Sequence, residues 1–186
     1  MKNNFFKNYF SKITGILSKL NTKDIEKLDK FISEIKKKKS KILVFGNGAN
    51  VSLASHFATD MTKNGKITTS SFGDGNLITC FSNDYGFENW IQNSIKYYSS
   101  KKDLVILLSA SGTSKNIIKA AKYCYKNKIK CASIYGFNKK NILSKYCRTN
   151  IWIDSKSYNL IEITQAAILL AIVDKKIGSL NYKSNL

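Results

Sequence analysis

Residues 104–118 read LVILLSASGTSKNII, and this stretch decides the fold. Five consecutive apolar residues, Leu104 to Leu108, are typical of a strand that is buried on both faces of a sheet. The loop that follows contains three serines, one threonine and Gly112, and a segment with helical spacing comes next. A strand that passes through a short loop into a helix is the building unit of parallel α/β sheets.

A second junction of the same kind lies upstream, where residues 41–50 read KILVFGNGAN. Backbone N–H groups at a helix start, beside glycine and small hydroxyl side chains, form a site for a phosphate. Val51 stands where a dinucleotide fingerprint needs its third glycine, and neither junction continues into the Gly-Lys-Ser/Thr of a nucleotide-binding loop. The two loops therefore favour a monophosphate, such as one carried by a sugar.

Strand-like and helical patterns alternate through the rest of the chain, without an internal repeat or a flexible linker. The predicted strands are 41–46, 67–72, 104–108, 131–135 and 150–153, and the predicted helices are 52–63, 88–98, 114–127, 140–146 and 158–177. This order predicts an α/β fold, a parallel sheet covered by helices on both faces. Ligands of such sheets bind beyond the carboxyl ends of the strands, where both serine and glycine loops lie.

Two amphipathic helices precede the sheet, so residues 1–186 are expected to form one domain with a helical hairpin at 1–39 and a core at 40–178. The first helix has a stripe that includes Phe6, Phe10, Ile13 and Leu17. This stripe is larger than one face of a small sheet needs, and apolar patches of that size seldom stay exposed. A second copy of the chain is therefore an expected partner.

The net charge is +19, from 31 basic and 12 acidic residues. Arg148 is the single arginine, and proteins that read nucleic acid favour arginine, so we do not expect nucleic acid as a partner. The four cysteines lack metal-finger spacing, and Cys80, Cys124 and Cys131 have apolar neighbours that suggest buried thiols. Neither a signal peptide nor a membrane span is evident, which makes the cytoplasm the expected location.

Three segments together resemble one family. They are GNGAN at 46–50 with ASHFA at 54–58, NDYGF at 83–87, and SASGTSKNIIKA at 109–120. Their order and spacing resemble the phosphoheptose isomerase group of the sugar isomerase (SIS) domain family. The resemblance implies a flavodoxin-like three-layer αβα sandwich, with a five-stranded parallel sheet and an N-terminal helical hairpin, assembled as a dimer or tetramer. It also implies a ketose or aldose phosphate as substrate, such as sedoheptulose 7-phosphate on the route to the heptoses of lipopolysaccharide or other surface polysaccharides.

The resemblance also assigns ligands for the phosphate and the sugar. They are Asn47, Gly48, Asn50, Asp84, Ser109, Ser111, Gly112 and Ser114. Ala110 and Asn50 stand where the family has threonine and serine, so each changes one hydroxyl contact.

The family's acid–base and metal-binding set is only partly present. His56, the chain's one histidine, matches the first histidine, and Asp60 stands at the glutamate four residues later. Glu162 aligns with a glutamine, and Leu170 stands at the second histidine. Isomerisation through an enediol needs a base and an acid, for which Asp60 and Glu162 are the candidates. His56, Asp60 and Glu162 together form a workable ligand set for a divalent ion, with zinc as the candidate cofactor.

Two functions therefore remain open at the level of sequence. One is a sugar-phosphate isomerase. The other is a non-catalytic SIS module that binds a phosphosugar or a protein partner, like the family's replication-initiator-associating member. Leu170 favours the second, while the phosphate-site residues match the family pattern better than the catalytic set does.

Overall fold

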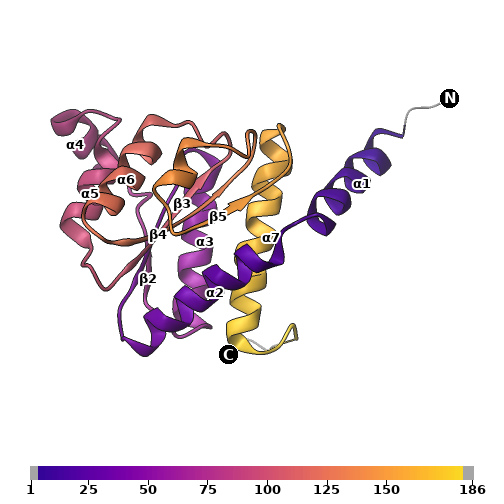
Figure 1. Ribbon diagram of the computed structural model, residues 1–186, viewed down its shortest axis with the longest axis horizontal. Helices are drawn as coiled ribbons and strands as arrows, with labels where there is room; N and C mark the ends of the chain where they lie inside the picture. Colours follow the sequence, from indigo (N-terminus) through magenta and orange to yellow (C-terminus); the bar gives the residue numbers. More distant parts are fainter. Residues whose placement is uncertain (1–3, 182–186) are drawn as a thin grey trace.

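The apolar runs pair into one parallel sheet. The computed structural model describes residues 4–181, and its strands are β1 (Ile42–Phe45), β2 (Thr69–Ser71), β3 (Leu104–Ser109), β4 (Lys130–Tyr135) and β5 (Thr149–Trp152). They lie in the order β2-β1-β3-β4-β5 with every neighbouring pair parallel (Figure 1). This is the flavodoxin-like order: β2 lies on one side of β1, and β3, β4 and β5 follow on the other side. The predicted sheet is confirmed.

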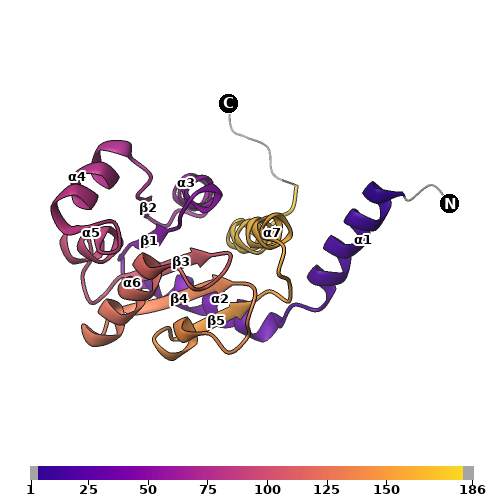
Figure 2. The ribbon, with the colours of Figure 1, turned by 90° about the horizontal axis from the view of Figure 1, so that it is seen from above.

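Helices cover both faces of this sheet, as the view in Figure 2 shows. One face carries α2 (Thr22–Lys37), α3 (Ala49–Lys63) and α7 (Tyr158–Ile177), and the other carries α5 (Trp90–Tyr98) and α6 (Lys115–Lys126). Strand side chains alternate between the two layers: Val44 packs in the first core cluster and Phe45 in the second. The fold is therefore the three-layer sandwich that the alternating pattern predicted.

Two short helices lie outside the main layers. The helix α4 (Gly75–Tyr85) has no fully buried residue, and only Leu77, Ile78 and Phe81 pack against the second core cluster. The predicted helix at 140–146 is reduced to the 3-10 helix η1 (Ile142–Lys145). No helix between residues 4 and 181 has both the length and the apolar composition needed to span a bilayer.

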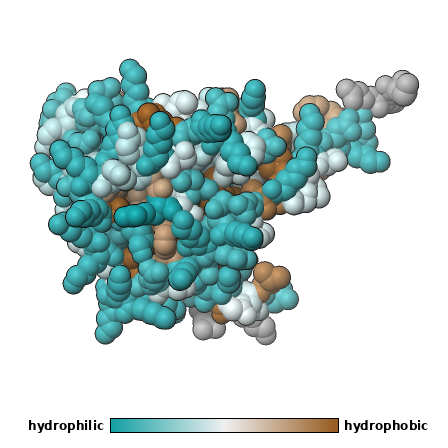
Figure 3. Space-filling model, in the orientation of Figure 1, coloured by the Kyte–Doolittle hydropathy of each residue, from teal (hydrophilic) through white to brown (hydrophobic). Residues whose placement is uncertain are grey.

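The first helix, α1 (Phe5–Ser18), extends away from the rest of the protein as an arm (Figure 1). None of its residues is buried, and Phe6 and Phe10 are 70% and 60% exposed. Figure 3 shows apolar side chains along this arm and at its junction with the body. Both predicted N-terminal helices are present, but α1 does not fold back along α2. Only its last turn, with Ile16, finds an apolar surface in the same chain.

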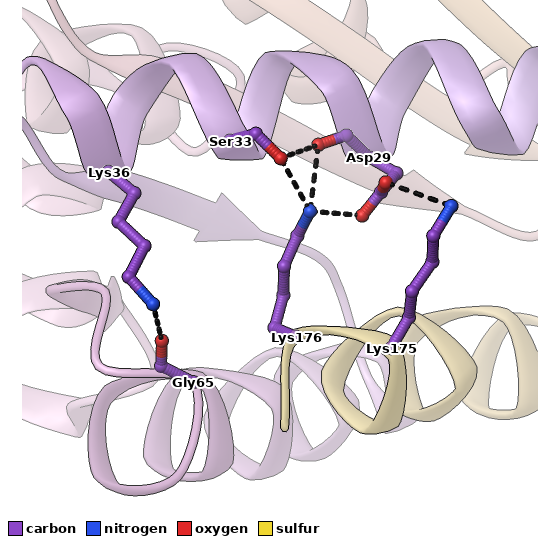
Figure 4. Close-up of polar contacts among 6 residues, drawn as sticks. All are labelled: Asp29, Ser33, Lys36, Gly65, Lys175 and Lys176. Carbon is purple, nitrogen blue, oxygen red and sulfur yellow. Dashed lines mark hydrogen bonds and ion pairs between the residues drawn. The ribbon is translucent and has the colours of Figure 1, made fainter. Parts of the chain in front are cut away.

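A cluster of charged side chains joins α2 to the end of α7 (Figure 4). Asp29 on α2 is 9% exposed and forms ion pairs with Lys175, at 3.1 Å, and with Lys176. The Lys176 ammonium also donates to the Ser33 hydroxyl at 2.6 Å and to the Asp29 carbonyl at 3.2 Å. Lys36 donates to the Gly65 carbonyl just after α3, so polar contacts connect α2 to the ends of both other helices on this face.

Candidate phosphate and sugar site

The loop after β3 is shaped by its own hydroxyl groups. The Ser109 hydroxyl accepts a hydrogen bond from the Gly112 N–H at 3.0 Å, and the Ser111 hydroxyl accepts one from the Thr113 N–H at 3.2 Å. Gly112 has φ +69°, and a Cβ there would lie 2.1 Å from the Asn141 side-chain nitrogen. Both the dihedral angle and the space therefore require glycine at this position.

The start of α6 lies directly after this loop. Ser114 is the N-cap residue, yet its side chain accepts no capping hydrogen bond from the helix. The first N–H groups of an α-helix have no partner within the helix and carry a partial positive charge. A phosphate placed here meets these N–H groups together with the Ser114 hydroxyl.

A pair of asparagines joins this loop to the loop after β1. Asn47 donates to Asn116 at 3.0 Å, and Asn116 donates back to Asn47 at 2.9 Å. The Asn116 oxygen also accepts from the Ile117 N–H at 2.9 Å. Next to Asn47, Gly48 begins α3 with φ +56° and ψ −128°, a region of backbone space that glycine alone adopts readily. The two loops are therefore held as one unit.

These loops border an open pocket of about 540 Å³. The residues that line it are Asn47, Phe87, Glu88, Ser114, Lys115 and Asn116. Phe87 is 60% exposed and supplies an apolar wall, while Lys115 supplies a positive charge beside the start of α6. The pocket thus combines phosphate-binding groups with groups that can contact a sugar.

Glu88 is the one carboxylate that lines this pocket. It pairs with Lys119 on α6, which also donates to the Asn89 side chain at 2.9 Å. The hydrogen bond and charge of Lys119 lower the pKa of Glu88 below its usual 4.5. A carboxylate with a lowered pKa is a weak general base at neutral pH, but it accepts hydrogen bonds from sugar hydroxyls.

The phosphate- and sugar-binding residues assigned from sequence take four different places. Asn47 and Ser114 line the pocket, while Gly48, Ser109, Ser111 and Gly112 set the shape of its two loops. Asn50 is 3% exposed, and its side-chain oxygen has no hydrogen-bond partner. Asp84 lies on the exposed side of α4, where it accepts from Asn83 at 3.0 Å, and it does not line the pocket.

The expected metal-binding set does not assemble in the chain. The His56 imidazole lies 3.1 Å from the Asp60 carboxylate on the outer side of α3, and Glu162 is half-buried on α7. Across residues 4–181 there is no group of three His, Cys, Asp or Glu side chains able to hold a metal ion. His56 and Asp60 therefore form a pair that Glu162 does not join, and the residues of one chain do not fit zinc.

Sequence reasoning missed several features of the site. Lys115 and Asn116 were inside the quoted motif but had no assigned role, and Glu88 follows NDYGF directly. The paired amides of Asn47 and Asn116 depend on the contact between two loops, which no local pattern reveals. Cys80 is exposed, whereas its apolar neighbours had suggested burial, because α4 packs loosely on the core.

Comparisons of the chain with known proteins find a matching domain family and similar curated proteins. Residues 8–136 match the model of the SIS domain. The chain is 28% identical over 137 residues to phosphoheptose isomerase 1 of Campylobacter jejuni, covering 70% of this chain and 73% of that protein. It is 36% identical over 106 residues to the phosphoheptose isomerase of Aliarcobacter butzleri, covering 53% of this chain and 55% of that one. The chain thus spans between about half and three quarters of these relatives.

Two solved structures have the same fold over nearly their whole length. The phosphoheptose isomerase of Neisseria gonorrhoeae superposes with a TM-score of 0.85 at 20% identity, covering 95% of this chain and 99% of that one. The phosphoheptose isomerase of Francisella tularensis gives 0.86 at 19% identity, covering 96% and 100%.

Proposed function

Because the chain belongs to the SIS domain family, we propose that it is a sugar-phosphate isomerase acting on a phosphoheptose such as sedoheptulose 7-phosphate. The observation that carries the proposal is the pocket at the start of α6, where the serine loop, Ser114 and the first turn of the helix converge. The likeness to phosphoheptose isomerases supports the choice of a seven-carbon sugar. We place the reaction in the cytoplasm, in the biosynthesis of heptoses for lipopolysaccharide or another surface polysaccharide.

The reaction moves a proton between two neighbouring carbons of the sugar. A base removes the proton from the carbon next to the carbonyl, an enediol forms, and the proton returns to the former carbonyl carbon while the hydroxyl proton moves between the oxygens. We assign the base to Asp60 and the positioning of this carboxylate to His56, 3.1 Å away. Glu88 is left to bind sugar hydroxyls, since its lowered pKa makes it a poor base.

The distance between the pocket and this pair favours a site that a second copy completes. At about 1.5 Å per residue, Asp60 lies roughly 16 Å along α3 from Ala49, where the helix begins beside the pocket. The pair also lies on the outer side of α3, so the sugar bound by one copy meets the acid–base pair of a neighbour. We therefore propose that each site combines the phosphate loop of one copy with His56 and Asp60 of another.

The arm formed by α1 supports this assembly. Its exposed phenylalanines need an apolar partner. An apolar groove of about 590 Å³ runs along the end of α7, beside Leu170. We propose that the arm packs on a second copy and that the assembly is a homodimer or a tetramer. The proposed mechanism contains no step on zinc, because no third His, Cys, Asp or Glu side chain between residues 4 and 181 of the same chain joins His56 and Asp60.

One observation favours a second candidate function. Leu170 lies at the family's second histidine position and lines an apolar groove, so this position supplies no ligand or acid. A chain that keeps the phosphate pocket and lacks this group has the chemistry of a binding module. Under this alternative the chain binds a phosphosugar without converting it.

Variants of the two carboxylates test the assignment of the base. Replacement of Asp60 by Asn removes the proton acceptor, so turnover is expected to fall by about two to four orders of magnitude while substrate affinity is kept. Glu88→Gln is the matched control and is expected to affect substrate affinity more than turnover. If Asp60→Asn keeps full turnover and Glu88→Gln loses it, Glu88 is the base and the assignment is wrong.

Mixed assemblies test whether the site is shared. Ser111→Leu removes the phosphate loop of a copy, and Asp60→Asn removes its base, so each variant alone is expected to be inactive. When the two are produced together, some sites combine an intact loop with an intact base, and a fraction of the activity returns. Inactive mixtures of variants that do assemble would place the whole site within one copy.

A further inference from the structure

A strongly basic hollow lies at the opposite edge of the sheet from the proposed active site. It has a volume of about 490 Å³ and is lined by Lys27, Phe31, Lys101, Lys128, Lys130 and Arg148. Lys130 begins β4, Arg148 directly precedes β5, and Lys101 shortly precedes β3. The hollow therefore lies at the amino ends of the strands, and a ligand there does not compete with one at the serine loop.

The positive charge in this hollow is largely uncompensated. Lys130 forms an ion pair with Glu34 and lies 4.4 Å from the centre of the Phe31 ring. The hydrogen bond from Lys130 lowers the pKa of Glu34, so this carboxylate remains ionised, and Lys130 is the lysine of the hollow with which it forms an ion pair. The other four cations, Lys27, Lys101, Lys128 and Arg148, have no ion pair with any residue from 4 to 181. Like charges gathered in a concave surface attract an anion with several charges.

Arg148 gives the hollow a feature that the general abundance of lysine does not explain. It is the single arginine of the chain, and its backbone N–H donates to the Cys131 carbonyl at 2.8 Å. The neighbours Cys147 and Thr149 are buried, which fixes the point from which the guanidinium extends. A guanidinium binds phosphate through two parallel hydrogen bonds, which an ammonium does not do.

A second hollow, of about 390 Å³, adjoins the first and shares Lys128 and Arg148 with it. Its other lining residues are mainly apolar or aromatic, among them Ile129, Tyr125 and Tyr146. Tyr125 is 63% exposed, and its ring lies 5.7 Å from that of Tyr146 in an edge-to-face arrangement. A planar ring system can stack on Tyr125 while phosphates attached to it reach Arg148.

We propose that the two hollows together form a binding site for a nucleoside diphosphate or triphosphate. The phosphates lie in the basic hollow among Lys101, Lys128 and Arg148, and the base lies against Tyr125. This site is separate from the phosphosugar pocket and does not depend on the function proposed for it. The site lies between the C-terminal end of α6 and the N-terminal end of β5. A nucleotide bound there contacts the protein without entering the phosphosugar pocket.

Calorimetric titration of the full chain with ATP and ADP tests the site directly. Saturable binding is expected in the unmodified chain, with affinity reduced about tenfold to a hundredfold by Arg148→Gln, since hydrogen bonds to a charged phosphate are lost. Lys63→Gln is the matched control, because it removes the same charge from an exposed position on α3, away from both hollows. Ser111→Leu is expected to leave the binding unchanged.

Three results would overturn the proposal. One is the absence of saturable binding at millimolar nucleotide. A second is an equal loss in Arg148→Gln and Lys63→Gln, which would mean attraction by net charge only. The third is loss of binding in Ser111→Leu, which would place the nucleotide in the phosphosugar pocket.

Further titrations test the roles of the base and of the hollow's shape. Inorganic triphosphate is expected to bind several-fold more weakly than ATP, and Tyr125→Leu is expected to remove that difference. Equal binding of the two ligands in the unmodified chain would overturn the role of the aromatic hollow. A single-stranded DNA oligomer that binds more tightly than ATP, and equally so after Tyr125→Leu, would identify the surface as a nucleic-acid patch instead.

Discussion

Ser111 and Gly112 determine the phosphate loop by different means. Ser111 accepts hydrogen bonds from the Thr113 N–H at 3.2 Å and from the Thr113 hydroxyl at 3.0 Å, which hold the turn in place. Gly112 supplies a positive φ and leaves room for the Asn141 side chain. Because a ligand phosphate needs the same concave backbone, side chains that fill this turn are expected to exclude it.

Replacement of Ser111 by Leu tests this role. The isobutyl group occupies the turn and removes an acceptor, so affinity for a phosphosugar or inorganic phosphate is expected to fall at least about tenfold to a hundredfold. Ser111→Ala is the matched control, since it removes the hydroxyl without adding bulk, and a smaller loss is expected. Circular dichroism checks that both variants fold. Unchanged affinity in Ser111→Leu by calorimetry would mean that phosphate binds elsewhere.

Asn47 and Asn116 depend on each other for their hydrogen bonds. Asn116 is 2% exposed, so its replacement by Leu leaves Asn47 and the Ile117 N–H without their partner. The expected loss in the free energy of unfolding is about 1–3 kcal/mol. A double-mutant cycle with Asn47→Leu is expected to show strong coupling in urea denaturation. Additive effects of the two substitutions would contradict a direct link between the loops.

The ion pair of Glu88 and Lys119 predicts a pH dependence of stability. The pKa of Glu88 is lower in the folded chain than its usual 4.5. Its stabilising effect is therefore fully present above that value and is lost as the pH falls through the lower, folded-state pKa. Lys119→Gln is expected to be slightly less stable than the unmodified chain at pH 7 and equally stable at strongly acidic pH. A difference in thermal unfolding that stays constant with pH would refute the pair's contribution.

At the scale of secondary structure, elements with a clear apolar period could be predicted, and α4, which lacks one, could not. The strand at 104–108 is a run of buried apolar residues, and β3 is found at Leu104–Ser109. The helix α4 was missed because its sequence, GNLITCFSNDY, combines weak helix formers with no fully buried position. Asp74 nevertheless caps it, accepting a hydrogen bond from the Leu77 N–H at 3.0 Å. The direction of α1 could not be predicted either, since amphipathic spacing indicates that a helix has an apolar face but not which surface covers that face.

The cluster that links α2 and α7 provides a prediction at this scale. Lys176→Met leaves the nearly buried Asp29 carboxylate without its closest charge and removes the bond to Ser33, so a loss of about 3 kcal/mol in the free energy of unfolding is expected. Lys175→Met is the matched control on the same helix. Its side chain is 60% exposed, so the expected loss is under about 1 kcal/mol. Equal losses in urea denaturation would contradict the importance of burial.

At the scale of the whole molecule, the position of the pocket could be predicted from the sequence more readily than the residues that carry out the reaction. The serine loop and the start of α6 are local features, and the pocket lined by Asn47 and Ser114 lies where the sequence predicted it, at the end of a buried strand. The relation of His56 and Asp60 to that site is not local, because in the proposed shared site it depends on how α3 of one copy meets another copy. Of the two roles expected for Glu162, the metal ligand is not found among residues 4–181 of one chain, and the acid stays a prediction, because alignment places this residue on α7 without showing which group its carboxylate meets.

Self-association is the first prediction at this scale. Light scattering at micromolar concentration is expected to give the mass of a dimer or tetramer, because the exposed phenylalanines of α1 need an apolar partner. The double variant Phe6→Glu/Phe10→Glu places charges in that contact and is expected to dissociate the assembly. Lys12→Glu is the control on the same helix. A monomeric mass for the unmodified chain would refute the shared site as well as the role of α1.

The central claim is that the chain converts a phosphoheptose through an enediol. The most direct measurement follows sedoheptulose 7-phosphate by NMR in D₂O with the purified, assembled protein. The account predicts conversion to the aldose 7-phosphate, with deuterium from the solvent entering at the carbon that receives the proton, and loss of both signals in Asp60→Asn. Saturable binding of the ketose with neither conversion nor deuterium uptake would contradict the account and identify the chain as a phosphosugar-binding module.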